Sequence, residues 1–265
     1  MEILGFILLI VSGILFFVKK QQDTKALSVK SARPANIADL KRLAGEIADE
    51  IGGGNWRDYV KVNGTIVCDR PLTSDLKQQD CVYYRMSVKR RYEATATRKD
   101  NDGKTQQTTS QRTQTVASNQ QSIPFVLRDR QGDEIEVNPA GADIETIKVV
   151  NEFQPGGDRT EICFGGFSQP IGVVSARANS KTLGYEYKES ILPLDRQVWV
   201  IGTVSDVTGE VVLQRPFKSD ERYIISLKSD EELAANADQG AKTAFYGMVG
   251  CAVLGLLLIL IGVIS

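Results

Sequence analysis

The densest basic cluster of this chain lies along one predicted strand. Arg85, Lys89 and Arg91 fall on one side of that strand, and Arg98 and Lys99 follow it. Guanidinium and ammonium groups on one face can bind the headgroups of anionic lipids or the carboxylates of an acidic partner. A solvated strand face is the alternative interpretation, because exposed charges are common. The pattern predicts a candidate membrane or partner contact at Arg85, Lys89 and Arg91.

A second candidate is a group of carboxylates in the sequence GYEYKESILPLDR. Glu186, Glu189 and Asp195 lie close to two tyrosines there, and two carboxylates beside aromatic rings are typical of a glycosidase. We favour the edge of a β-hairpin with ordinary surface charges, followed by a strand whose Trp199 and Ile201 pack into the core. No catalytic residue, cofactor site or metal site is therefore predicted.

Histidine is absent from the 265 residues. This excludes nucleophiles activated by histidine and zinc sites that contain it. The four cysteines, Cys68, Cys81, Cys163 and Cys251, form no CxxC pair, which argues against a cysteine zinc site. We expect the first three to be small buried side chains, and a Cys68–Cys81 disulfide only in an oxidising compartment.

The charges of the chain are balanced. It has 32 basic and 33 acidic residues, and Glu2 is the only charged residue outside residues 19–243. The middle segment is therefore neutral, and we expect no nucleic-acid partner, because binding to phosphates needs a strongly basic surface.

Two apolar segments, Ile3–Val18 and Ala244–Ile264, lie at the two ends of the sequence. About 20 apolar residues are needed to cross a bilayer, and the second segment has that length without a charge. The first segment is shorter, but Lys19 and Lys20 can extend to the interface. We predict a two-span integral membrane protein. Its parts are a transmembrane helix at 1–18, a linker at 19–35, one soluble domain at 36–243 and a transmembrane helix at 244–264.

Basic residues after the first segment bear on which side the domain faces. Lys19, Lys20, Lys25, Lys30 and Arg33 favour a cytoplasmic domain by the positive-inside rule. A periplasm-like location is the alternative, since long domains are translocated largely regardless of charge.

Small residues recur every four positions in the second apolar segment, at Gly247, Cys251 and Gly255. This spacing puts them on one helix face and is typical of close helix packing in membranes. The predicted partner is the first segment, which carries Ser12 and Gly13; homo-oligomerisation through these helices is the alternative.

Between these segments, the periodicity first predicts one amphipathic helix. It begins after an N-cap at Asn36 and ends at Gly52–Gly54. A phosphate-binding loop is not supported at these glycines, because they end a helix and no Lys-Ser/Thr pair follows.

After this helix the apolar period changes to two, which is typical of strands. A strand with a turn at Asn63-Gly64 is predicted at 59–68, and a second strand at 81–95. A turn at Asn101-Asp102-Gly103 then leads into a polar return strand that ends near residue 122. Two short strands are predicted within 123–137, and further strands at 159–167, 197–204, 210–213 and 223–227. A short helix at 229–237, capped by Ser229 and Glu232, leads into the second apolar segment. The predicted fold class is a β-rich α+β domain beside the membrane, flanked by two terminal transmembrane helices.

The order of these segments resembles the GIDE family, which includes the mulan (MAPL) type of E3 ubiquitin ligase in the outer membranes of mitochondria and chloroplasts. The resemblance is carried by VKVNGTIVCDRPLTSDLKQQDCVYYRMSV, IPFVLRDRQGDEIEVNPAGAD, GYEYKESILPLDRQVWVIGTV and YIISLKSDEEL. It implies a membrane-adjacent domain that senses or binds partners.

Members of this ligase type continue past the second span into a RING finger, whereas this sequence ends at Ser265. We therefore expect a RING-less, prokaryotic member that acts as a non-enzymatic, membrane-tethered interaction or sensing module. Its expected partners are membrane lipids and an unknown protein. The alternatives are an E3 ubiquitin ligase-like protein that works through a separate RING partner, and a structural protein that organises the membrane.

Overall fold

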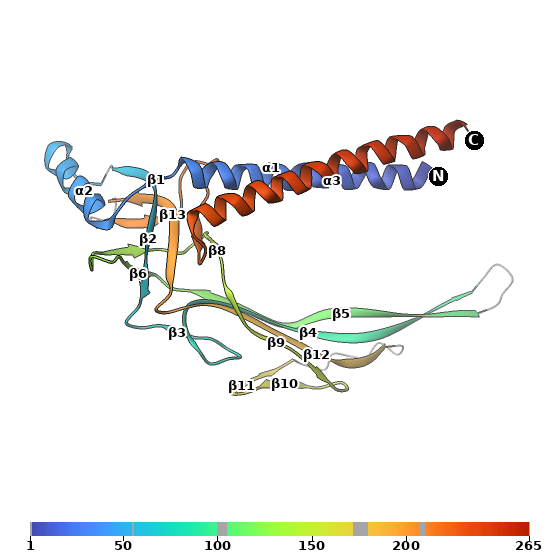
Figure 1. Cartoon of the computed structure of the whole chain (residues 1–265). Coiled ribbons are helices and arrows are strands. Elements are labelled where there is room, and N and C mark those ends of the chain that lie inside the picture. Colours follow the sequence, from blue (N-terminus) through green and yellow to red (C-terminus); the bar gives the residue numbers. More distant parts are fainter. Residues whose placement is uncertain (1, 55, 100–104, 172–179, 207–209, 265) are drawn as a thin grey trace. The chain divides into compact units, whose positions relative to one another are not determined.

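The computed structural model describes residues 2–54, 56–99, 105–171, 180–206 and 210–264 (Figure 1). The chain forms two compact units that alternate along the sequence. The first unit contains Met1–Thr65, Val126–Ile144 and Gln197–Ser265, and the second contains Ile66–Phe125 and Glu145–Arg196. The long strands of the second unit pair mainly with one another.

The first unit contains the helices and a sheet that closes on itself. Its elements are α1 (Glu2–Ser31), β1 (Arg33–Pro34), α2 (Ile37–Ile51), β2 (Arg57–Val67), β6 (Phe125–Arg128), β7 (Glu134–Val137), β8 (Asp143–Ile144), β13 (Gln197–Ser205), β14 (Val212–Gln214), β15 (Ile224–Ser226) and α3 (Asp230–Ile264). Neighbouring strands follow the order β1-β2-β6-β7-β14-β13-β15-β8, and β2 also pairs with β13. This extra pairing closes β2, β6, β7, β14 and β13 into a small barrel.

Apolar residues at every second position form the core of this barrel. Buried and half-buried residues alternate along β2 from Val60 to Ile66, as the period of two predicts. Val62 lies opposite Val200 of β13, and neither has exposed surface. The other face of β13 is also covered, since Ile201 packs in a cluster with Val29 of α1. The prediction for Ile201 is confirmed, whereas Trp199 is only half-buried.

The predicted turn at Asn63-Gly64 is wrong. β2 continues through both residues, with Asn63 opposite Trp199 and Gly64 opposite Val198. A Cβ atom on Gly64 would lie 2.7 Å from the backbone oxygen of Arg128, so glycine is needed where β6 approaches closely. Asn-Gly is typical of a hairpin turn, but here its glycine allows β6 to pack closely against β2.

Helices α1 and α3 lie side by side, and the two ends of the chain lie at the same end of this pair (Figure 1). Both are long and apolar enough to cross a membrane, which fits a two-span membrane protein. α1 continues through the segment expected as a linker as far as Ser31. The predicted cap of α3 is confirmed: the Glu232 N–H donates to Ser229 Oγ at 3.2 Å, and the Ser229 N–H donates to Glu232 Oε2 at 3.3 Å.

α2 begins and ends where the sequence predicts. The Asp39 N–H donates to Asn36 Oδ1 at 2.7 Å, which satisfies one of the free donors at the helix start. Gly52 ends the helix with φ of 85°, and its N–H donates to the oxygen of Ala48. Ile37 is fully buried, which confirms the amphipathic pattern.

The second unit is a sheet of long strands with a short hairpin. Its elements are β3 (Leu72–Thr73), β4 (Asp80–Lys99), β5 (Thr105–Ser122), β9 (Ile147–Pro155), β10 (Glu161–Phe164), β11 (Phe167–Pro170) and β12 (Ser180–Pro193). β12 lies between β4 and β9, and β5 pairs along β4. The polar return strand is confirmed as β5, whereas the predicted turn at residues 101–103 lies outside the described residues.

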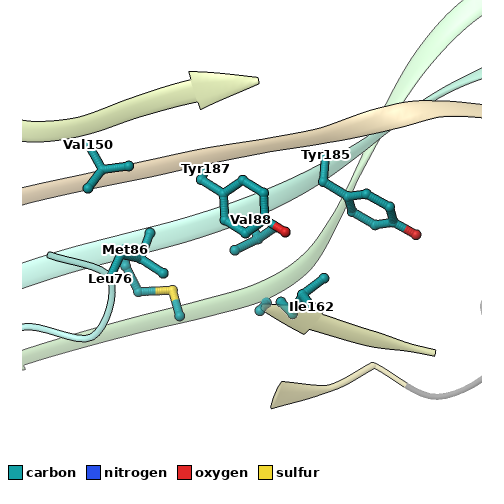
Figure 2. Packing of buried hydrophobic residues seen from close by; sticks show 8 residues of the cluster. Leu76, Met86, Val88, Val150, Ile162, Tyr185 and Tyr187 are labelled. Carbon is teal, nitrogen blue, oxygen red and sulfur yellow. The ribbon is translucent and has the colours of Figure 1, made fainter. Parts of the chain in front are cut away.

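The β12 strand is central, not the edge that the sequence predicted. Tyr185 and Tyr187 point from it into a cluster with Met86 and Val88 of β4 (Figure 2). Ile162 of the short hairpin belongs to the same cluster. β12 pairs on both edges, and Glu186 and Lys188 lie on the face opposite Tyr185 and Tyr187, whereas Glu189 lies on the same buried face as these tyrosines.

Candidate functional site

The three predicted contact residues share one face of β4. Arg85 and Arg91 are exposed and Lys89 is half-buried, while Tyr84, Met86 and Val88 of the other face are buried. Arg85 Nε donates to Gln120 Oε1 of β5 at 2.9 Å. The side chains of Arg98 and Lys99, which the sequence grouped with them, lie outside the described residues.

Glu186 of β12 is surrounded by cations of this face. Its Oε1 lies 2.9 Å from Lys188 Nζ and 3.3 Å from a guanidinium nitrogen of Arg91, and Lys89 lies directly opposite. The hydrogen bond from Lys188, together with the charges of Lys188, Arg91 and Lys89, lowers the pKa of Glu186. The carboxylate is therefore ionised at neutral pH, and three cations share it.

Phe153 of β9 completes this surface. Its ring is 40% exposed, and the guanidinium carbon of Arg91 lies 5.1 Å from the ring centroid. A Cβ atom on Gly184 would lie 2.7 Å from Phe153 Cζ, so the ring crosses β12 where there is no side chain. The basic face is defined here as Arg85, Lys89, Arg91, Phe153 and Lys188.

The carboxylates weighed as a glycosidase pair do not face each other. Glu186 and Glu189 lie on opposite faces of β12, because their spacing along the strand is odd. Glu189 is buried and accepts hydrogen bonds from Ser74 Oγ at 3.0 Å and from the N–H groups of Leu76 and Lys77 at 2.8 Å each. A carboxylate occupied by three donors holds a loop and cannot act on a substrate.

Arg90 is a second buried charge of this sheet. The sequence shows that it interrupts the apolar face of β4, but not what accepts its hydrogen bonds. Its Nε donates to Thr182 Oγ1 at 2.6 Å, and its Nη2 lies 3.0 Å from Asp158 Oδ1. Asp158 also accepts a hydrogen bond from Thr182, and that bond, with the bond from Arg90, lowers the pKa of Asp158. The network is structural.

In the first unit, the small residues of α3 lie against α1. A Cβ atom on Gly247 would lie 3.2 Å from Leu15 Cδ1, and one on Gly255 would lie 3.0 Å from the oxygen of Gly5. Cys251, between them, is half-buried. Of the residues expected on α1, Ser12 donates to the oxygen of Met248 at 3.0 Å, whereas nothing lies within 4 Å of a Cβ built on Gly13. Nothing in the sequence indicated that Gly5 contacts Gly255, apart from the small size of Gly5.

In a comparison with protein families, residues 93–260 match a family model described as GIDE, E3 ubiquitin ligase. This chain belongs to the GIDE family. The match extends from β4 into α3 and confirms the resemblance seen in the sequence. No curated protein and no solved structure matches the chain.

The cysteines of this GIDE chain are free thiols in different environments. Cys81 is buried and Cys68 is half-buried, whereas Cys163 is exposed, so the expectation of a buried side chain is wrong for Cys163. The short β10–β11 hairpin explains this, since only one face of it, with Ile162, packs on the sheet. Among the described residues, no group of three or more Cys, Asp or Glu side chains could hold a metal ion.

Proposed function

We propose that this GIDE chain is a non-enzymatic, membrane-tethered interaction module that binds an acidic protein segment on its basic face. The observation that carries this proposal is the combination of Arg85, Lys89 and Arg91 with an exposed aromatic ring. Aromatic and arginine side chains are enriched at binding hot spots, since they combine apolar area with directed hydrogen bonds.

The arrangement of Phe153 favours a protein over a membrane as the partner. Its ring lies over Gly184 and under the Arg91 guanidinium, which gives the face a defined shape. A bilayer surface needs only positive charge, whereas a peptide with acidic and aromatic residues also uses such a shape. Lipid binding by this face is therefore one outcome of the test.

Binding is tested with the full chain in nanodiscs of uncharged lipid. The probe is a fluorescent peptide of alternating glutamate and tyrosine, and its anisotropy reports the affinity. We expect the triple variant R85Q/K89Q/R91Q to bind about tenfold more weakly or worse, as loss of charged hydrogen bonds implies. The control K41Q/R42Q/R130Q removes the same charge from exposed positions of the first unit and should bind normally.

Equal binding by the triple variant and by the chain without substitutions would contradict the proposal. Nanodiscs that instead attach to vesicles of anionic lipid, and lose this attachment in the triple variant, would assign the face to membranes.

The family description favours a second function, ubiquitin ligation, through a separate RING partner. Incubation of the purified chain with E1, E2 and ubiquitin, with and without an added RING protein, separates the two functions. We expect no conjugates that depend on the chain alone, and their formation would overturn the non-enzymatic proposal. If the chain instead organises the membrane as a structural protein, variants that lose peptide binding should keep the localisation of the chain unchanged.

A further inference from the structure

A cavity of about 470 Å³ opens in the first unit beside α1. One wall is the part of α1 that follows its apolar run, and the other is the loop between β14 and β15. Its charged or aromatic lining includes Lys25, Asp143, Arg215, Phe217, Lys218 and Arg222. This cavity was not predictable from the sequence, because its lining residues come from segments that are far apart in the chain.

The acidic groups of the cavity are already paired. Lys25 Nζ lies 2.8 Å from Asp143 Oδ2, and Lys218 Nζ lies 3.1 Å from Glu221 Oε1. Within the described part of the chain, no ion pair joins Arg215 or Arg222 to a carboxylate. Two guanidinium groups with unused donors therefore line one polar cavity.

Arg222 supplies an independent observation. Its Nε is buried and has no hydrogen-bond partner among the described residues. A buried charged donor without an acceptor is unfavourable, and proteins normally supply an acceptor, a water molecule or an ion. An anion in the cavity that Arg222 lines would act as an acceptor for its guanidinium group.

The loop that carries Arg222 is held in place. The Arg222 N–H donates to Ser28 Oγ at 3.2 Å, Ser28 Oγ donates to the oxygen of Asp220 at 3.1 Å, and Tyr59 Oη donates to the oxygen of Arg222 at 2.8 Å. At the other wall, a Cβ atom on Gly141 would lie 3.0 Å from Arg215 Cδ, so glycine leaves room for that side chain. The Arg222 side chain thus starts from a positioned backbone.

The depth of the cavity relative to a membrane follows from α1. Gln21 and Lys25 lie three and seven residues after Val18, the last residue of the apolar run, on one uninterrupted helix. At about 1.5 Å per residue, this is about 5 to 10 Å beyond the hydrocarbon boundary. The headgroup layer is about 5 to 8 Å thick on each side. Phe217, beside the cavity, is 67% exposed, as an aromatic side chain at an interface would be.

We propose that this cavity binds the phosphate group of an anionic membrane lipid, with Arg215 and Arg222 donating to the phosphate oxygens. Guanidinium groups bind phosphate through paired hydrogen bonds, and a lipid at this depth presents its phosphate without leaving the bilayer. The cavity lies in a different unit from the basic face, so this proposal does not depend on the proposed function.

The test uses the full chain in detergent with equal amounts of phosphatidylcholine and phosphatidic acid, and native mass spectrometry counts the lipids retained. We expect preferential retention of phosphatidic acid. R215E, at an exposed side chain, should reduce it about tenfold, and R215Q/R222Q should reduce it further. The control K41Q/R42Q removes two exposed charges of α2 and should retain the lipid normally. R215E also keeps the test valid if R222Q fails to fold.

A competition arm distinguishes lipid from free phosphate. Dihexanoyl phosphatidic acid should displace the retained lipid at concentrations at which inorganic phosphate does not. Equal displacement by inorganic phosphate would overturn a lipid as the source. Equal retention of the two lipids, or unchanged retention by R215E and R215Q/R222Q, would overturn the site.

Discussion

At the scale of single residues, one buried carboxylate fixes a loop to the central strand of the second unit. Glu189 accepts three hydrogen bonds, two of them from consecutive backbone N–H groups at Leu76 and Lys77. The N–H of the buried Leu76 needs such an acceptor, because water does not reach it. Glu189 therefore stabilises the loop between β3 and β4.

Substitution E189Q tests this role. An amide offers one oxygen and a donor group, so at least one of the three donors loses its acceptor and the charge is lost. We expect the free energy of unfolding to fall by about 2 to 3 kcal/mol. Thermal unfolding of the full chain in nanodiscs measures this, with E152Q at an exposed position of β9 as the control. Equal stability of the two variants would contradict the role.

The pair of Arg90 and Asp158 predicts an acid dependence. The pKa of Asp158 is lowered in the folded state by Thr182 and Arg90, so its carboxylate stabilises the fold above its unfolded pKa, near 4 on average. This contribution is lost as the pH falls through the lower folded value. Since the Asp158 side chain is 49% exposed, solvent screening limits the contribution to about 1 kcal/mol.

Melting curves of D158N between pH 7 and pH 2 measure this contribution. D158N should melt below the unsubstituted chain at pH 7, and the difference should shrink as the pH falls below about 4. The control D69N changes an exposed carboxylate and should show no such difference. A constant difference at every pH would exclude the ion pair as its cause.

Residue-scale predictions from sequence were limited by distance along the chain. The alternation along β4 correctly separated Arg85 and Arg91 from the buried side, because that pattern is local. The partners of Glu189 lie 112 to 115 residues earlier, and no local pattern indicates them. A glutamate in phase with Tyr185 and Tyr187 was the available signal for a buried acceptor.

At the scale of elements, the contact between α1 and α3 depends on small residues. In G255V the new Cβ atom would lie 3.0 Å from the oxygen of Gly5, so the valine side chain would press against α1. G250V has the same change in helix propensity, and nothing lies within 4 Å of that Cβ. We expect G255V to lower the free energy of unfolding by about 1 to 3 kcal/mol and G250V to have little effect. Thermal unfolding in nanodiscs compares them, and equal effects would exclude helix packing as the cause.

The sequence predicts an element well where capping residues mark its two ends. It does not predict the position of a strand that depends on strands distant in the sequence. Asn36 and Gly52 delimit α2 by bonds within a few residues, so the sequence determines its bounds. The prediction of a turn at Asn63-Gly64 was wrong because the glycine there serves contacts with β6 and β13, which are both distant in sequence. The central position of β12 likewise depends on β4 and β9.

At the scale of the whole molecule, the side of the membrane that the domain faces is testable with native cysteines. Cys163 is exposed, whereas Cys81 is buried and burial raises its pKa to about 11, so its thiol stays protonated and unreactive near neutral pH. From the lysines after the first span we expect a cytoplasmic domain. A membrane-impermeant maleimide should then label the chain only after cells are lysed.

The variant C163S identifies the labelled thiol and should lose most of the signal. Labelling of intact cells that C163S abolishes would place the second unit outside the cytoplasm and contradict the expectation. The division into two units was not predictable from length and composition, because it depends on which distant strands pair.

The alternation of the two units along the sequence also fixes the order in which the chain can fold. Val62 of β2 must pair with Val200 of β13, which leaves the ribosome 138 residues later. At about 5 to 20 residues per second, β2 waits for roughly 7 to 30 seconds without its partner. The second unit is complete at Arg196, before β13 is made. It can therefore fold first, while the barrel of the first unit still lacks β13.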